Sequence, residues 1–422
     1  MLELSYIREH REDVIQRLGI KNFKGIHLVG EILQADSDRR KIQKNLDDIL
    51  ALSNQAAREI GILYKSGRVE EASEIKEKTA EWKAQSKELA DRLAGSETQL
   101  NNLLVQLPNM PHPSVPRGFS AEQNENVYQE GDLPDLGPEA MPHWDLIKKY
   151  DIIDFELGNK VTGAGFPFYK GKGAKLERAL IAFFLDAAVS AGYLEVQPPL
   201  LVNADSGYGT GQLPDKDGQM YVVTEENFYL IPTAEVPITN IYRGVILPGE
   251  NLPVKNVAYS SCFRREAGSW GKDVRGLNRL HQFDKVEVVQ IVHPDKSYEA
   301  LEEMRTHVAG LLHALQLPFR IMKLCGGDLS FTSALTYDFE VYSAAQEKWL
   351  EVSSVSNFES FQSNRMKCRF RDQEGKTRLA HTLNGSALAL PRVVAALLEN
   401  NQGPEGIAIP DVLRTYTGFG MI

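Results

Sequence analysis

A long heptad repeat in residues 28–104 constrains the fold of this chain more than any other sequence feature. Apolar side chains recur at alternating spacings of four and three residues, interrupted in the first half by Arg39. This spacing is typical of helices that pack along a common seam. The sequence KSGR at 65–68 breaks the repeat, which then starts again. We therefore expect two helices, each about 50 Å long, in an antiparallel hairpin that projects as an arm.

The repeat leaves two interpretations of the arm open. It can be a coiled coil that joins two copies of the chain, or a lever that reaches a distant part of a large ligand. Basic side chains occur on the first helix and at the tip, at Arg39, Arg40, Lys41, Lys44, Lys65 and Arg68. Acidic residues are as common along the arm, so the charge pattern favours neither interpretation.

The composition indicates a globular cytoplasmic chain of two or three domains, with 422 residues of which 42% are hydrophobic. With a net charge of −10, any nucleic-acid site must be a local basic patch. We expect no membrane association, since the sequence has neither a signal pattern nor an apolar run of the ~18 residues that a membrane span needs. The scattered cysteines predict reduced thiols and no zinc site: Cys262, Cys325 and Cys368.

A proline-rich segment, LPNMPHPSVPRG, marks a domain boundary. Its prolines exclude a helix and favour a stiff, extended link. We expect an N-terminal domain in residues 1–107, a linker in 108–120 and a second domain in 121–422. The first 20 residues are expected to form one short helix that ends at Gly19, and residues 124–137 to be turn-rich.

Residues 257–291 carry the most distinctive side-chain pattern. Two strand-like runs, 257–266 and 280–291, flank a glycine-rich loop. Because side chains alternate along a strand, one face collects charged and aromatic groups while Val286 and Val288 face a core. That face and the loop hold Arg264, Glu266, Gly268, Gly271, Lys272, Arg275, Gly276, Arg279, His281, Phe283, Lys285 and Glu287.

This face suits a nucleotide, although a solvated hairpin with surface ion pairs is the alternative. Arginine binds phosphate or carboxylate through two parallel hydrogen bonds. An aromatic ring can stack on a base, worth about 1–3 kcal/mol. The order F-R-x-E, basic glycine-rich loop, R-x-x-x-F-x-x-x-E resembles motif 2 of the class II aminoacyl-tRNA synthetases, which favours the nucleotide site.

Two further segments resemble the other motifs of that class. A helix and an edge strand with consecutive prolines, in residues 173–201, resemble motif 1, which forms the dimer interface of the class. Residues 378–400 resemble motif 3. There we expect a strand that ends at Asn384 and a helix whose N-terminus holds Asn384 and Ser386, with Arg392 beyond them.

Two smaller patterns carry polar groups. Glu351 and Ser354 are expected at the close of a strand, where a bulge or the strand's end must bring both to one side. Their oxygens suit Mg²⁺, with a simply solvated glutamate as the alternative. Thr233 can cap a helix, but the triplet Thr233-Ala234-Glu235 resembles the loop that seats serine in seryl-tRNA synthetases.

The resemblance to seryl-tRNA synthetases of the bacterial and eukaryotic type extends over the whole chain. It implies an α+β fold, with an N-terminal tRNA-binding coiled-coil arm and a catalytic domain built on an antiparallel sheet flanked by helices. It implies a homodimer that activates L-serine with ATP and Mg²⁺ and charges tRNA(Ser), with tRNA(Sec) left open. Two rival functions are a ligase for carrier proteins and an inactive paralogue that binds tRNA.

The resemblance also implies roles for single residues. Arg264, Arg279 and Arg392 are the implied catalytic residues, and Glu351 and Ser354 are the implied metal ligands. The implied ATP site comprises Arg264, Arg265, Glu266, Arg279, Phe283, Glu351, Val352, Ser353, Ser354 and Arg392. The implied serine site comprises Thr233, Ala234, Glu235, Arg264, Glu287, Asn384 and Ser386.

Overall fold

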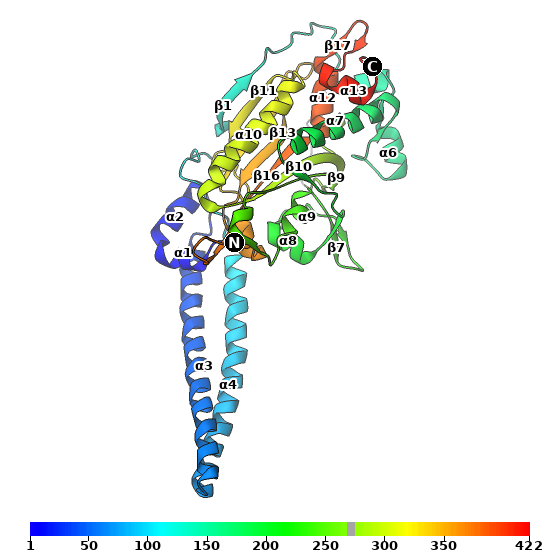
Figure 1. Ribbon diagram of the computed structural model, residues 1–422. Helices are drawn as coiled ribbons and strands as arrows, with labels where there is room; N and C mark the ends of the chain where they lie inside the picture. The colour runs from blue at the N-terminus through cyan, green and yellow to red at the C-terminus, as the bar shows by residue number, and fades with distance from the viewer. Residues whose placement is uncertain (268–274) are drawn as a thin grey trace. The chain divides into compact units, whose positions relative to one another are not determined.

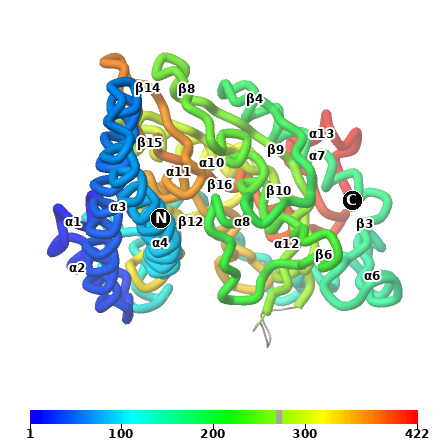
Figure 2. The backbone as a smooth tube through the Cα atoms, turned by 90° about the horizontal axis from the view of Figure 1, so that it is seen from below, coloured from blue at the N-terminus to red at the C-terminus, as the bar shows by residue number. Residues whose placement is uncertain are grey.

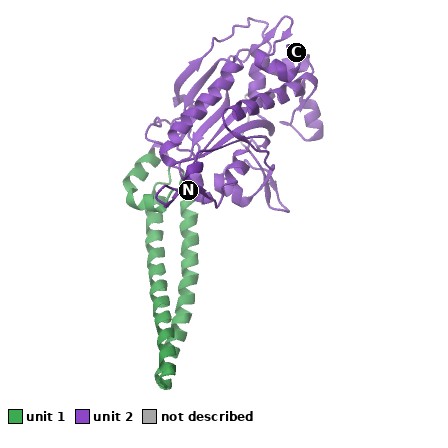
Figure 3. Cartoon of the chain, in the orientation of Figure 1, with its two compact units in different colours: residues 1–19, 23–108 green, residues 20–22, 109–422 purple. Residues whose placement is uncertain are grey.

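The computed structural model describes residues 1–267 and 275–422, and the chain forms two compact units. The first unit comprises residues 1–19 and 23–108, and the second comprises residues 20–22 and 109–422 (Figure 3). Three residues of the expected glycine-rich loop, Gly268, Gly271 and Lys272, lie outside the described residues. Within the two described ranges, no helix combines the length and the apolar character that a membrane crossing requires.

The first unit is dominated by two long helices that run side by side (Figure 1). The predicted two-helix arm is confirmed, with its break at residues 66–68. Gly67 in that turn has a φ of +76°, a left-handed conformation that favours glycine. The prediction of a single N-terminal helix was wrong, because two short helices form there. The helices of this unit are α1 (Leu4–Glu9), α2 (Arg11–Ile20), α3 (His27–Lys65) and α4 (Val69–Leu104).

A buried carboxylate lies near the start of α3. Asp36 is fully buried, and its oxygens lie 3.1 Å from Arg8, 3.1 Å from Arg39 and 3.2 Å from Arg40. Three guanidinium groups therefore offset the cost of removing one carboxylate from water. Two of the basic residues noted on the arm, Arg39 and Arg40, thus neutralise a charge within this unit.

An eight-stranded sheet organises the second unit, in the order β1-β11-β12-β13-β16-β10-β9-β4. Neighbouring strands are antiparallel except for the parallel pair β4 and β9. The predicted α+β class with an antiparallel sheet is confirmed. The strands are β1 (Glu125–Glu130), β4 (Leu194–Glu195), β9 (Val254–Phe263), β10 (Gln282–Val292), β11 (Phe319–Lys323), β12 (Leu335–Ser343), β13 (Lys348–Asn357) and β16 (His381–Ala389).

Three helices cover one face of this sheet: α7 (Gly171–Ser190), α10 (Ser297–Ala314) and α12 (Leu390–Asn400) (Figure 1). Val286 and Val288 are fully buried in the core between the sheet and these helices, as predicted. Because side chains alternate along β10, Lys285 and Glu287 point to the opposite face. That second face carries the polar groups described below.

Smaller elements surround the sheet, including a second sheet in which β14 pairs with β8 (Figure 2). They are α5 (His143–Lys149), β2 (Ile153–Asp154), α6 (Phe155–Val161), β3 (Phe168–Tyr169), β5 (Leu201–Asn203), α8 (Ala204–Thr210), β6 (Val222–Val223), β7 (Phe228–Leu230), α9 (Glu235–Asn240), β8 (Ile246–Pro248), α11 (Phe361–Met366), β14 (Arg369–Arg371), β15 (Thr377–Leu379), β17 (Gln402–Gly403), β18 (Gly406–Ile407) and α13 (Asp411–Thr417). Short 3-10 helices span Ala121–Gln123, Gly249–Asn251, Gly276–Asn278 and Pro294–Lys296.

Three further expectations about secondary structure were wrong. The strand expected at 257–266 ends at Phe263 as β9, so Arg264 and Glu266 lie beyond it, and the φ of Glu266 is +49°. Residues 124–137 contain β1, an edge strand paired with β11, in addition to turns. The strand β16 continues to Ala389, so Asn384 and Ser386 lie inside a strand and not at a helix N-terminus. The run of alanine and leucine that follows has high helix propensity. It is nevertheless extended, because β10 pairs with β16 at Ser386 and Ala389, whereas the pairing with β13 is confined to residues 383–385.

Candidate active site

The open face of the sheet holds a cavity of about 690 Å³. Its walls come from β10, β11, β12, β13 and β16, from the segment that follows β9 and from the start of α12. Most of the predicted site residues line it: Thr233, Glu235, Arg264, Glu266, Arg279, Phe283, Glu287, Glu351, Val352, Ser353, Ser354, Asn384, Ser386 and Arg392. Residues as far apart in sequence as Thr233 and Arg392, 159 positions, are therefore brought to one site.

Two of the predicted site residues do not line the cavity. Ala234 is fully buried in a small apolar cluster with Ile238. Arg265 donates its backbone N–H to the carbonyl of Gln219 at 2.9 Å. Its side chain was expected to point away from Arg264 because neighbouring residues alternate.

Arg264 lies against the aromatic ring of the site. Its guanidinium carbon is 5.3 Å from the centroid of the Phe283 ring, and its Nε donates to the carbonyl of Pro232 at 3.3 Å. A cation over a ring face is held by the ring's quadrupole. The contact presents one guanidinium group and one flat apolar surface to the same part of the cavity.

Two further guanidinium groups lie on the cavity wall. Arg279 forms an ion pair of 3.0 Å with Glu266. Arg392 donates from Nε to the carbonyl of Asn278 at 3.0 Å and from Nη1 to the carbonyl of Glu351 at 2.7 Å. Three fixed positive charges from three segments of the chain thus border one cavity, which favours an anionic ligand.

Buried carboxylates form another part of the wall. Burial, together with the nearby Glu287 carboxylate, raises the pKa of Glu235 to about 7. Gln362 donates to Glu235 at 2.6 Å, and the hydroxyl of Thr233 accepts the N–H of Glu235 at 3.2 Å. That hydroxyl contact resembles the expected cap, although α9 itself begins at Glu235.

Glu287 is bound differently from Glu235. Lys285 lies 2.6 Å from its Oε2 in a buried ion pair, and the Ser386 hydroxyl donates to the same oxygen at 3.3 Å. The two carboxylates therefore differ in their electrostatic surroundings: Glu287 is paired with an ammonium group, and Glu235 accepts a hydrogen bond from a neutral amide.

The expected bulge is present in β13. The pairing of β12 with β13 shifts register between Phe339 and Glu340, which brings Glu351 and Ser354 to the same side. The Ser354 hydroxyl lies 3.5 Å from Oε1 of Glu351. Because β13 continues to Asn357, the strand's end is not the reason for this arrangement.

The sequence interpretation missed several polar residues of the cavity. Asp338 lies beside Glu351, and burial, together with the Glu351 charge, raises the pKa of Asp338 well above its ordinary range. The alternation of Thr336, Asp338 and Glu340 along one strand was the signal that could have found it. Gln362, by contrast, lies in the short helix α11 and reaches Glu235 only through tertiary folding, so its local sequence carries no such signal.

The antiparallel sheet with three arginines on its open face defines a class II aminoacyl-tRNA synthetase. Residues 221–401 match the model of the tRNA synthetase class II core domain (G, H, P, S and T), and residues 1–111 match the seryl-tRNA synthetase N-terminal domain. The chain belongs to the seryl-tRNA synthetase family.

Full-length relatives support this assignment. The chain is 50% identical to a serine--tRNA ligase of Salinibacter ruber and 46% identical to one of Chlorobium phaeovibrioides, in each case over 100% of this chain and 99% of the relative. Among solved structures, seryl-tRNA synthetase from Pyrococcus horikoshii complexed with ATP is 34% identical with a TM-score of 0.93. That similarity covers 100% of this chain and 99% of the other.

Proposed function

We propose that this chain activates L-serine with ATP to give seryl-adenylate and pyrophosphate, and then transfers serine to tRNA(Ser). The observation that carries the proposal is the convergence of Arg264, Arg279 and Arg392 on one cavity beside the ring of Phe283. The chain is an ATP-dependent ligase of its family, since it matches serine--tRNA ligases along its whole length. The same match sets aside the alternative of an inactive paralogue.

The nucleotide is proposed to lie across the open face of the sheet. Its adenine stacks on Phe283 and is oriented by Glu266, while Arg264 holds the α-phosphate and the serine carboxylate. Arg279 and Arg392 hold the γ-phosphate, and we call the wall formed by these two residues the phosphate end of the cavity. The cation–ring contact of Arg264 with Phe283 supports this arrangement, because it places base and phosphate sites next to each other.

Serine is proposed to lie among the buried polar groups next to Arg264. The carboxylate of Glu235 attracts the ammonium group, and Glu287 and Ser386 read the hydroxyl, with Thr233 and Asn384 beside them. A site that hydrogen-bonds a hydroxyl rejects the analogue without it by about 10⁴–10⁵. Alanine is therefore excluded strongly, and threonine only by fit.

Mg²⁺ is proposed to bind with ATP at Glu351 and Ser354. The donors fit, because carboxylate and hydroxyl oxygens are the ligands that this cation prefers. Within the described residues, Oδ1 of the neighbouring Asp338 has no hydrogen-bond partner, and no group of three His, Cys, Asp or Glu side chains is arranged to hold a metal alone. Bound there, the cation supplies positive charge that offsets the charge of the phosphates.

The proposed chemistry needs no covalent nucleophile on the enzyme. The serine carboxylate attacks the α-phosphorus in line and pyrophosphate leaves. A hydroxyl of the terminal ribose of the tRNA then attacks the seryl carbonyl, loses its proton and displaces AMP. Arg264 stabilises the charge on the α-phosphate, and positioning supplies much of the remaining acceleration. Before a ligand binds, Arg264 and Arg392 are already held in the cavity by hydrogen bonds to backbone carbonyls, and Arg264 also by its contact with Phe283.

The remaining assignments follow the family. We propose a cytoplasmic homodimer in which the arm contacts the tRNA. The domains are proposed to comprise residues 1–107 and 121–422, joined by a linker at 108–120. Whether tRNA(Sec) is also charged is left open. Exposed apolar side chains around the motif 1 segment support the dimer: Val189, Leu194, Leu200 and Leu201. Such a group of exposed apolar residues is typical of a protein interface.

Exchange of labelled pyrophosphate into ATP tests the proposed activity. We expect exchange that depends on L-serine and on Mg²⁺, with alanine giving no measurable rate. The variant Arg264→Ala should abolish the exchange while its melting temperature stays close to that of the wild type. Exchange with another amino acid but not with serine would overturn the assignment of the serine site.

A further inference from the structure

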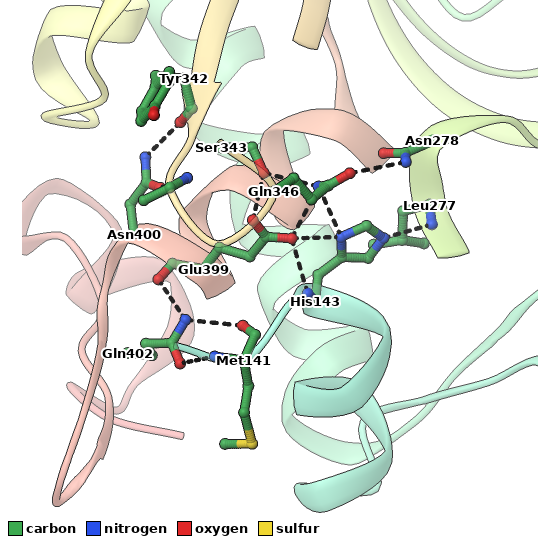
Figure 4. A network of polar contacts seen from close by, with 11 residues as sticks. Met141, His143, Leu277, Asn278, Tyr342, Ser343, Gln346, Glu399, Asn400 and Gln402 are labelled. Carbon is green, nitrogen blue, oxygen red and sulfur yellow. Dashed lines mark hydrogen bonds and ion pairs between the residues drawn. The ribbon is translucent and has the colours of Figure 1, made fainter. Parts of the chain in front are cut away.

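A fully buried histidine, His143, lies in a network of polar contacts with Leu277, Gln346 and Glu399 (Figure 4). His143, at the start of α5, places its Nε2 2.9 Å from the backbone nitrogen of Leu277 and its Nδ1 2.7 Å from Oε1 of Glu399. A backbone N–H can only donate, so Nε2 must accept. His143 is therefore a neutral imidazole whose Nδ1–H donates to the Glu399 carboxylate.

Glu399, near the end of α12, is the centre of this group. Burial raises the pKa of Glu399, but hydrogen bonds from His143 and Ser343 together lower this pKa by more, so that it lies below its ordinary value. Its Oε1 also accepts the backbone N–H of His143 at 2.8 Å and the amide of Gln346 at 2.9 Å. A buried carboxylate with this many donors is a rigid anchor, because removing any donor leaves charge unsatisfied.

The anchor is connected to two arginines of the cavity. Gln346 accepts a hydrogen bond from the side chain of Asn278 at 3.0 Å, and the main-chain carbonyl of Asn278 accepts from Arg392 at 3.0 Å. Arg392 and Glu399 are seven residues apart on α12, so they lie on the same face of the helix. Arg279 follows Asn278 directly in the chain.

Two contacts outside this hydrogen-bond group hold the same segment. A Cβ added to Gly276 would lie 2.2 Å from Nε2 of His143, and the φ of Gly276 is +66°. The guanidinium carbon of Arg275 lies 4.6 Å from the ring centroid of Trp144, the neighbour of His143. Helix α5 thus contacts every residue from 275 to 277 at close range.

We propose that His143 and Glu399 are positioning residues, which fix the 276–278 turn and thereby hold Arg279 and Arg392 at the phosphate end of the cavity. The inference rests on the proposed function, since it assumes that these arginines meet the γ-phosphate. Neither His143 nor Glu399 lines the cavity, so both act only through the residues that they hold.

Binding of ATP and of AMP, each measured by calorimetry with Mg²⁺ present, tests the proposal. AMP lacks the γ-phosphate that Arg279 and Arg392 are proposed to meet, so it reports folding and the binding of adenosine and the α-phosphate. For His143→Ala, Glu399→Gln and Gly276→Ala we expect ATP to bind about tenfold more weakly or worse, and AMP to bind within about twofold of the wild type. His143→Gln keeps one donor and one acceptor and should recover most of the ATP affinity.

The matched control is His381→Ala. His381 is a partly buried histidine whose Nδ1 lies 2.9 Å from the hydroxyl of Ser297, but it does not line the cavity. It should weaken ATP and AMP binding equally or not at all.

Equal losses of ATP and AMP affinity in the His143 and Glu399 variants would overturn the positioning role, and so would the absence of any loss. Arg392→Ala separates this failure from a failure of the proposed function. If Arg392→Ala weakens ATP but not AMP while the His143 variants do not, the positioning inference alone is wrong. If Arg392→Ala also lacks the ATP-specific loss, the γ-phosphate assignment is wrong.

Discussion

At the scale of single residues, the cavity keeps two neighbouring carboxylates in different surroundings. Glu287 has the ammonium of Lys285 at 2.6 Å, while Glu235 accepts the neutral amide of Gln362 at 2.6 Å. Burial and the Glu287 charge raise the pKa of Glu235 to about 7. Without a ligand, Glu235 therefore changes charge close to neutral pH, and a bound ammonium group favours its ionised form.

This predicts a pH dependence for serine binding. The carboxylate of Glu235 is charged above about pH 7 and protonated below it. Serine should therefore bind about tenfold more tightly at pH 8 than at pH 6, since the ammonium group of the free amino acid, beside its own carboxylate, stays largely protonated over that range. Calorimetric titration of serine at several pH values measures this. In Glu235→Gln the affinity should be weak at both pH values, and a variant that kept the wild-type slope would assign the titration to another group.

Phe283 carries a separate prediction, for the nucleotide. Phe283→Ala should weaken ATP binding by about 1–3 kcal/mol, since a base loses its stacking surface. Serine binding should weaken much less, since Arg264, which is proposed to hold the serine carboxylate, loses its ring contact but keeps its hydrogen bond to Pro232. The Michaelis constants for ATP and serine in pyrophosphate exchange distinguish the two effects, and Phe283→Tyr, which keeps the ring, serves as the control. A similar rise in both constants would indicate a general loss of site structure.

At the scale of elements, local patterns predicted what local interactions decide. The heptads and the KSGR break predicted α3 and α4. Glu351 and Ser354 are three residues apart and would point to opposite faces of a regular strand, which predicted the bulge in β13. The strand β16 could not be read in this way. Its alanine and leucine residues favour a helix, and pairing with β10, which is distant in sequence, makes them extended.

The buried cluster around Asp36 predicts a large cost for one substitution in the first unit. Asp36→Ala leaves Arg8, Arg39 and Arg40 without their shared carboxylate. The three guanidinium groups are partly exposed and can be hydrated, so the cost stays below the ~3–5 kcal/mol of a fully buried pair, but this unit should still unfold below the wild-type temperature. Thermal unfolding followed by circular dichroism measures the shift. Asp38→Ala is the control, because Asp38 lies on the same helix with an exposed side chain; equal shifts in the two variants would contradict the argument.

At the scale of the whole molecule, the sequence predicted which residues meet but not how they are held. Most of the predicted site residues line one cavity, because the three motifs contain the side chains that are proposed to bind one ligand. The supports are different: Gln362, Gln346 and Glu399 act across separate elements, and nothing in their neighbouring sequence indicates their partners. Contacts of this kind depend on the tertiary fold alone.

The two compact units predict a separation of activities. In a variant lacking residues 45–89, with a short glycine–serine turn in their place, α3 and α4 are cut at equal distances from their joining turn and the Asp36 cluster is kept. Serine-dependent pyrophosphate exchange should remain within about twofold of the wild type, because every residue of the cavity lies in the second unit. Charging of tRNA(Ser) should fall by at least about a hundredfold, since the arm is proposed to contact the tRNA. Exchange and aminoacylation assays on one preparation measure both. Unchanged charging would instead support the interpretation of the arm as a coiled coil that joins two chains. In that case, size-exclusion chromatography of the same variant should show a monomer.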